Sequence, residues 1–251
     1  MVPAIDLANT SGFLATVDPG IARERVILID NTDDSSIGKR HFEEVRAVHA
    51  HGRNLGVSAS WNLGARSVLC PNETDYQVLG LDRPATFVTF CSTSIRFNDA
   101  AGGLCRTADL AAENHQWLFG FESCKGWHLI TFGKATFDAV GWVDENFWPG
   151  YFNDNDMIRR MRLAGIMEPA GGDRALRQFP WVGALNPGLV GDAEALKHCG
   201  IEWDRDANLR YYIDKWGREP GGERFELPFN DPANLLSYWP ATIKPEMDGD
   251  R

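Results

Sequence analysis

The chain alternates short apolar runs with polar stretches that suit helices. The clearest run, residues 25–30, is rich in β-branched side chains and ends in Asp30 and Asn31, which is typical of a buried parallel strand followed by a loop. Strands that alternate with helices indicate an α/β fold, with a mostly parallel sheet and helices on both faces. Further strands are expected at residues 45–49, 86–91 and 127–132, and helices at 36–44, 58–67, 107–115, 134–140 and 154–164.

The two ends of the chain depart from this pattern. Only Met1, Val2 and Pro3 precede the polar Asp6, so the first strand is either very short or supplied elsewhere. From about residue 191 the pattern changes to expected helices at 192–198 and 208–216, followed by a tail rich in Pro and Gly. We therefore expect a core domain over residues 1–190 and a C-terminal extension, residues 191–251, packed on it.

Composition excludes several classes of protein. Hydrophobic residues make up 43% of the 251 residues and the formal net charge is -10, which suits a globular protein and argues against a nucleic-acid binder. The five cysteines form no CxxC pair, so we expect neither a zinc site nor a disulfide framework. A cytoplasmic location is the simplest expectation for such a chain. Neither a signal peptide nor an apolar run of the roughly 18 residues that span a bilayer is evident, so no transmembrane segment is expected.

Two polar segments are candidates for ligand binding. Asp30 stands where α/β sheets bind ligands, at the carboxyl end of a strand, but it could equally cap its own loop in an Asx-turn. An N-x-G pattern occurs twice, at residues 54–56 and 62–64. Its small residues let the backbone approach either a ligand or a neighbouring strand, and tight packing is the slightly favoured interpretation for Gly56 and Gly64.

A third candidate is the acidic start of the expected helix 154–164. Asp154 could be a general base, or Asp154 and Asp156 could bind a cation. Local physics favours a structural alternative, in which Asp154 is the N-cap and Asp156 pairs with Arg160 four residues on. His198, in an expected helix, is interpreted as a satisfied or exposed histidine rather than a metal ligand.

Over roughly residues 1–165, these segments resemble in order and spacing the family 2 glycosyltransferases, which have the GT-A fold. The resemblance lies in residues 26–31 (VILIDN), the doubled N-x-G segment 54–64, the block formed by 126–130 and 137–147 (FDAVGWVDENF), and residues 151–156, where the family carries an E-D dipeptide.

The resemblance implies a transferase that moves a sugar from a nucleotide-sugar donor, with UDP the expected nucleotide, to a hydroxyl of a glycan or protein acceptor. It matches Asp154 to the general base of inverting members, with Asn153 in place of the usual Glu. The expected donor-binding residues are Asp30, Asn31, Asn62, Ser92, Thr93, Ser94, Arg96 and Lys215, and those on the acceptor side are Trp127, His128, Asn153 and Asp156.

The sequence departs from the family at two places. Ser92, Thr93 and Ser94 stand where the family carries a D-x-D metal motif, and Trp61 replaces an expected Arg. Because hydroxyls are weak ligands for divalent cations, we expect no tightly bound metal and at most a weak dependence on Mn²⁺ or Mg²⁺. Arg96, Lys215 or backbone amides would then stabilise the leaving diphosphate. In the alternative, one of two other D-x-D patterns, at residues 154–156 and 204–206, would itself bind a cation.

Residues 210–217 (RYYIDKWG) resemble the tail of some actinobacterial and phage relatives. This resemblance is the basis for including Lys215 among the residues that could reach the diphosphate. Two other functions stay open. The missing D-x-D motif would also suit a catalytically degenerate GT-A-fold module that only binds a glycan or nucleotide. A nucleotidyltransferase is disfavoured, because residues 6–20 carry no Gly-rich, basic loop.

Overall fold

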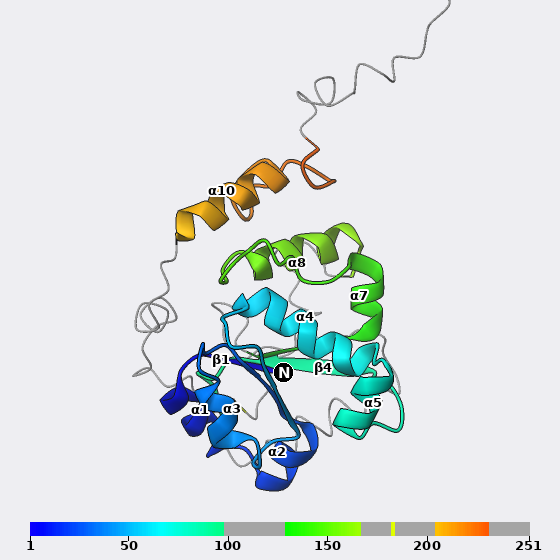
Figure 1. Cartoon of the computed structure of the whole chain (residues 1–251). Helices are drawn as coiled ribbons and strands as arrows, with labels where there is room; N and C mark the ends of the chain where they lie inside the picture. Colours follow the sequence, from blue (N-terminus) through cyan, green and yellow to red (C-terminus); the bar gives the residue numbers. More distant parts are fainter. Residues whose placement is uncertain (98–128, 167–181, 184–203, 231–251) are drawn as a thin grey trace, which may run out of the picture. The chain divides into compact units, whose positions relative to one another are not determined.

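The computed structural model describes residues 1–97, 129–166, 182–183 and 204–230 (Figure 1). The chain divides into two compact units, Met1–Trp203 and Asp204–Arg251. The described elements of the first unit are β1 (Val2–Ala4), α1 (Leu7–Leu14), α2 (Pro19–Arg25), β2 (Ile27–Asp30), α3 (Ser36–His41), β3 (Ala47–Ala50), α4 (Gly56–Leu69), α5 (Glu73–Leu79), β4 (Phe87–Cys91), β5 (Arg96–Phe97), β6 (Leu129–Gly133), α7 (Lys134–Val140), α8 (Asn153–Leu163) and β7 (Val182–Gly183).

The central strands run in the order β3-β2-β1-β4-β6. Strands β1, β2 and β3 pair in parallel, whereas β6 is antiparallel to β4. Two hydrogen bonds join the halves: the Met1 amine donates to Thr89 O at 2.6 Å, and Cys91 N donates to Met1 O at 2.9 Å. Met1 thus bonds to Thr89 and Cys91, the two residues that flank Phe90, and this is the hydrogen-bond pattern of parallel strands. The expected α/β fold with a mostly parallel sheet is confirmed, and its first strand is indeed short.

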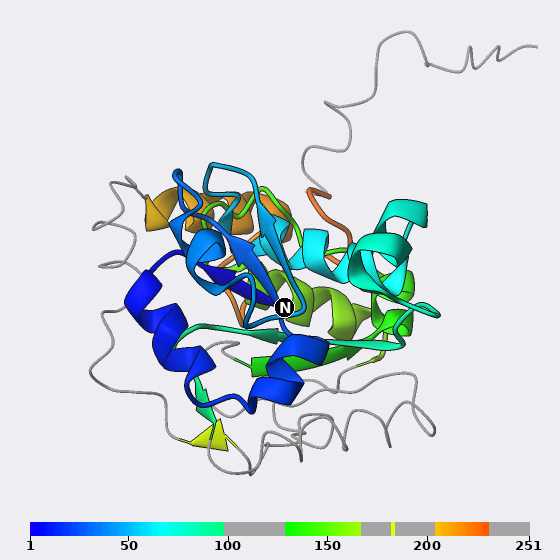
Figure 2. The ribbon, with the colours of Figure 1, turned by 60° about the horizontal axis from the view of Figure 1, so that its bottom comes forward.

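Each face of the sheet supports its own hydrophobic core, because successive side chains of a strand point to opposite faces. Ile27 and Ile29 pack in a core with α4, α7 and α8, whose centre is Trp61 stacked on Phe90 at 4.8 Å. Leu28 packs on the other face with α1, α2 and α3. Figures 1 and 2 show α4 and α8 on one side of the strands and α1 and α2 on the other. Burial on both faces explains the continuous apolar run in β2.

Three short helices, α1, α2 and α5, were not expected from the apolar pattern. Each begins at a capping side chain. Asp6 accepts from Asn9 N at 2.6 Å, Asp18 accepts from the first amides of α2, and Asn72 forms a capping box with Asp75. These caps satisfy helix-end amides that would otherwise be unpaired.

The second unit contains α10 (Arg205–Trp216), close to the expected helix 208–216. The helix ends at Gly217, whose left-handed φ of 81° and close approach to Phe225 exclude a larger residue. Lys215 is only 6% exposed, with its Nζ 6.0 Å from the ring centre of Tyr211 and 5.7 Å from that of Trp216.

The remaining predicted elements, helices 107–115 and 192–198, lie outside the described residues, as does His198. Of the helices that the structure describes, none has the length and apolar character needed to cross a membrane.

Candidate active site

The order of the strands locates the candidate site. Strands β2 and β3 are added in turn on one side of β1. The chain then passes through α4 and α5, and β4 pairs with β1 on its opposite side. In open α/β sheets a crevice forms at such a reversal, outside the carboxyl ends of the strands, and ligands bind there. In this chain the reversal lies between Asp6, which follows β1 and caps α1, and the turn at Ser92–Ser94, which follows β4.

The turn after β4 presents hydroxyls and a cation. Ser92 Oγ and Ser94 Oγ lie 2.7 Å apart, and Arg96 Nη1 donates to Thr93 O at 2.7 Å and to Ile95 O at 2.8 Å. The guanidinium also lies against α1, since Arg96 Nη2 and Cζ are the nearest atoms to a Cβ added at Gly12. Burial lowers the pKa of Arg96 from its usual value. A positive charge is thus fixed between the segments that follow β1 and β4.

Asp30, at the end of β2, is fully buried and hydrogen-bonded within the chain. Its Oδ2 accepts from Gly38 N at 2.6 Å, and its Oδ1 accepts from Thr32 N at 2.9 Å and from Thr32 Oγ1. The Asx-turn that the sequence left as an alternative is therefore present. The carboxylate fixes the loop that leads from β2 into α3, and its donor contact stays a prediction.

Asn31 links the same sheet edge to the first N-x-G segment. Its Oδ1 accepts from Leu55 N at 3.0 Å, and its Nδ2 donates to Ser60 Oγ at 3.0 Å. Asn54 Oδ1 in turn accepts from Gly56 N at 2.8 Å. The N–H groups of Leu55, Gly56 and Val57 at the start of α4 are thus already hydrogen-bonded within the chain. This agrees with the slightly favoured interpretation that the small residues of the first N-x-G segment serve close packing.

The loop before α8 packs on this same start of α4. Val57 N donates to Pro149 O at 2.7 Å. Gly56 has a φ of +79°, and a Cβ there would lie 2.7 Å from Trp148 Cδ1. Gly64 also approaches a neighbour, with Met1 Sδ 2.7 Å from an added Cβ. This series of contacts, from β2 through α4 to the loop, holds the beginning of α8 at the carboxyl edge of the sheet.

Helix α8 carries the acidic pair, but Asp154 is not its N-cap. The N-cap is Phe152, in a left-handed conformation without a side-chain cap, so Asp154 lies inside the first turn and that expectation is wrong. Asp154 is half-buried, and its Oδ1 accepts from Asn155 N at 2.8 Å. Negative charge is favourable in the first turn of a helix, where it meets the positive end of the dipole.

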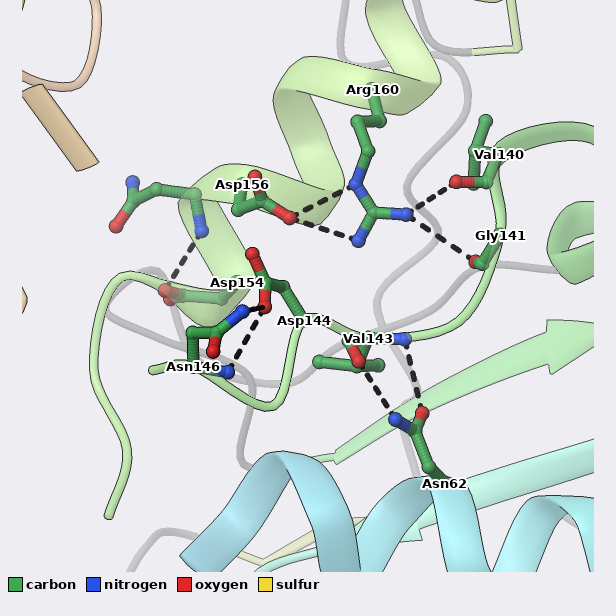
Figure 3. Close-up of polar contacts among 10 residues, drawn as sticks. Asn62, Val140, Gly141, Val143, Asp144, Asn146, Asp154, Asp156 and Arg160 are labelled. Carbon is green, nitrogen blue, oxygen red and sulfur yellow. Dashed lines mark hydrogen bonds and ion pairs between the residues drawn. The ribbon is translucent and has the colours of Figure 1, made fainter. Parts of the chain in front are cut away.

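Asp156 pairs with Arg160, as the spacing predicted. Asp156 is fully buried, and its Oδ2 lies 2.9 Å from both Nε and Nη2 of Arg160 (Figure 3). The guanidinium also donates to the carbonyls of Val140 and Gly141, where α7 ends. Asp156 thus fixes the first turn of α8 against α7.

Asn62, expected to bind the donor, is buried and joins α4 to the loop after α7. Its Oδ1 accepts from Val143 N at 3.0 Å, and its Nδ2 donates to Val143 O at 2.7 Å (Figure 3). Asn62 Nδ2 also donates to Glu145 Oε1 at 2.7 Å. The side chain supports the loop that leads to Asp154. The sequence did not indicate this role, because no local pattern connects residues 81 positions apart.

The structure brings together part of the predicted site. Asp30, Asn31, the turn after β4 and Asp154 share one sheet edge. Lys215 belongs to the second unit, while Trp127 and His128 lie outside the described residues. The sequence analysis did not identify Asp6 as the N-cap of α1, although an Asp that follows a first strand and precedes a helix is itself a signal.

Two further features bear on ligands. Within the described ranges, no three His, Cys, Asp or Glu side chains gather as a possible metal site. A cavity of about 450 Å³ is lined by residues at the amino ends of strands, among them Met1, Val26 and Phe87, and also by Cys91 and Phe97 on either side of the turn after β4.

The comparisons with known proteins find likeness among solved structures. No family model matches the chain, and no curated protein matches it. Among solved structures, the chain is similar to the crystal structure of S. aureus TarS, residues 1–349, with 10% sequence identity and a TM-score of 0.41. The match covers 83% of this chain and 67% of that one. Similarity at this level adds no argument about the chemistry of this chain, which rests on the site.

Proposed function

We propose that the protein is a GT-A-type glycosyltransferase that moves a sugar from a nucleotide-sugar donor to an acceptor hydroxyl. The observation that carries the proposal is the series of contacts that holds Asp154 at the same sheet edge as the turn after β4. In this proposal Asp154 is the carboxylate for the acceptor and Arg96 the cation for the donor, and both serve one site at the strand reversal, where α/β sheets bind ligands.

The donor would lie across the carboxyl ends of β1, β2 and β4, with UDP the nucleotide to test first. In this proposal Arg96 and the hydroxyls of Ser92 and Ser94 face the diphosphate. Asp30 and Asn31 shape the nucleotide side, because their side chains order the loop after β2 and the start of α4. A fixed cation stabilises charge on a departing diphosphate without having to reorganise during the reaction.

In the proposed reaction Asp154 takes the proton of the acceptor hydroxyl. The acceptor oxygen attacks the anomeric carbon of the donor sugar as the bond from that carbon to the diphosphate oxygen breaks. The nucleoside diphosphate leaves with the bonding electron pair, and the anomeric configuration inverts. A carboxylate is suited to this step because a neutral alcohol is a poor nucleophile at physiological pH.

The test is a screen of purified protein against UDP-, GDP- and dTDP-sugars, with release of nucleoside diphosphate as the readout. We expect at least one donor to be hydrolysed slowly by water alone. The variant Arg96→Gln should reduce the rate, whereas Arg83→Gln, which changes an exposed arginine outside the site, should not. Absence of turnover with every donor would overturn the proposal.

The same screen separates the alternative, a GT-A-fold module that binds without catalysis. The observation that favours it is the turn after β4, whose hydroxyls replace the carboxylates of the D-x-D motif. Such a module would show a raised melting temperature with a nucleotide sugar but no release of nucleoside diphosphate.

A further inference from the structure

Two aromatic side chains are exposed to solvent shortly before Asp154 in the chain. Trp148 is 43% exposed and Tyr151 is 36% exposed, in the loop that leads into α8. The aromatic residues that flank them are buried: Phe147 is fully buried and Phe152 is 8% exposed. The loop therefore anchors two rings in the core and presents two others outward.

The backbone of this loop is strained. Tyr151 and Phe152 have φ values of 70° and 64°, so two consecutive residues other than glycine adopt the left-handed conformation. Such strain persists only where the surroundings impose it, and it concentrates at functional sites. Here the bond from Val57 N to Pro149 O holds the loop, and Gly150 approaches Val57 closely, with 3.3 Å between an added Cβ and Val57 Cγ2.

An unused hydrogen-bond donor lies next to these rings in the chain. Asn153 is 5% exposed, and its Nδ2 has no hydrogen-bond partner in the part of the chain that the structure describes. Buried amides are nearly always paired, so an unpaired one between Tyr151 and Asp154 is consistent with a partner that arrives from outside the chain.

We propose that Trp148 and Tyr151 form a stacking platform for a pyranose ring of the acceptor. The site would therefore take a glycan or glycoside rather than a simple alcohol or an amino-acid side chain. The C–H groups on the flat face of a sugar ring are attracted to the negative face of an aromatic ring. The ring of the acceptor would stack on the platform while its hydroxyl reaches Asp154, so this inference rests on the proposed function.

The experiment uses the full chain and a panel of methyl pyranosides, with glycerol as a hydroxyl-bearing probe that has no ring. Binding is followed by saturation-transfer NMR and by tryptophan fluorescence. We expect at least one pyranoside to bind, and glycerol not to bind. Trp148→Ala should weaken that binding about tenfold, the change expected when a well-placed ring contact is lost. Phe42→Ala, which removes an aromatic ring that is 60% exposed outside the site, should leave it unchanged.

Tyr151 supplies a second pair of variants in case Trp148→Ala fails to fold. Tyr151→Phe keeps the ring and should bind the pyranoside. Tyr151→Asn removes the ring, should bind more weakly, and suits the left-handed backbone. The platform is refuted if no pyranoside binds the wild-type protein, or if ring removal at both positions leaves affinity unchanged in folded variants. Donor hydrolysis by the wild-type protein tests the proposed function separately.

Discussion

Asn62 and Val143 form a reciprocal pair of hydrogen bonds between α4 and the loop after α7. The side-chain oxygen accepts from Val143 N at 3.0 Å, and the side-chain amide donates to Val143 O at 2.7 Å. Asn62 is 1% exposed and Val143 is 2% exposed, so water does not replace these bonds when one partner is lost. The pair holds a loop whose continuation leads to Asp154.

Replacement of Asn62 by Leu should destabilise the protein by about 3 kcal/mol, because it leaves a buried N–H and a buried C=O unpaired. The measurement is the free energy of unfolding from urea denaturation. The control is Asn72→Ala, which removes an exposed N-cap and should cost about 1 kcal/mol. Equal costs for the two variants would show that the pair with Val143 contributes no more than an ordinary cap.

Replacement of Arg160 by Leu should cost at least about 3 kcal/mol, because it strands the buried carboxylate of Asp156 and two carbonyls at the end of α7. The matched control is the exposed pair Lys134–Asp138, where Lys134→Leu should change stability by no more than about 1 kcal/mol. Thermal melting of both variants makes the comparison. A similar melting temperature for the two would contradict the anchoring role of Arg160.

Replacement of Gly56 by Ala should destabilise more than the same change at Gly165. Both residues have positive φ, +79° and +70°, so both variants pay about 1–2 kcal/mol for the backbone conformation. Only at Gly56 does the added Cβ meet neighbours, Trp148 Cδ1 at 2.7 Å and Pro149 O at 3.1 Å, whereas nothing lies within 4 Å at Gly165. The free energies of unfolding of the two variants, measured by urea denaturation, should differ by at least about 1 kcal/mol. Equal values would show that the loop before α8 moves to accommodate the added Cβ at no cost in stability.

Transfer or donor hydrolysis should persist in EDTA, and Mn²⁺ should raise the rate only weakly. The physical reason is the turn after β4, where Ser92, Thr93 and Ser94 offer hydroxyls in place of carboxylates and Arg96 supplies positive charge. The check is titration of activity with the chelator, followed by return of Mn²⁺. Complete loss in EDTA with full recovery at micromolar Mn²⁺ would show that a metal site exists.

The pattern of apolar residues predicted the sheet and the longer helices well. Strand β2 stood out because both of its faces are buried, and α7 has the expected limits because Gly133 and Gly141 delimit it. The pattern failed for α1, α2 and α5, which are only seven or eight residues long. In such short helices capping side chains carry more information than periodicity, and the caps at Asp18 and Asn72 could have been recognised.

The candidate site was less predictable, because its geometry depends on contacts between distant segments. Sequence alone could not decide whether the Asp30 carboxylate faces a ligand or its own loop, and the structure directs it to Thr32 and Gly38. Nor could it reveal that Asn62 reaches Val143. The i,i+4 pair of Asp156 and Arg160 was predictable, since helix geometry alone brings the two together.

The central claim is that Asp154 is the base in a sugar transfer, and the most direct test compares Asp154→Asn with the wild-type protein. With a donor found in the nucleotide-sugar screen and a pyranoside acceptor, kcat should fall by about 10²–10⁴-fold, since proton removal by a positioned carboxylate contributes that much. Donor affinity should stay unchanged, and the control Asp138→Asn, at an exposed site on α7, should transfer at the wild-type rate. Transfer at the wild-type rate by Asp154→Asn would contradict the account.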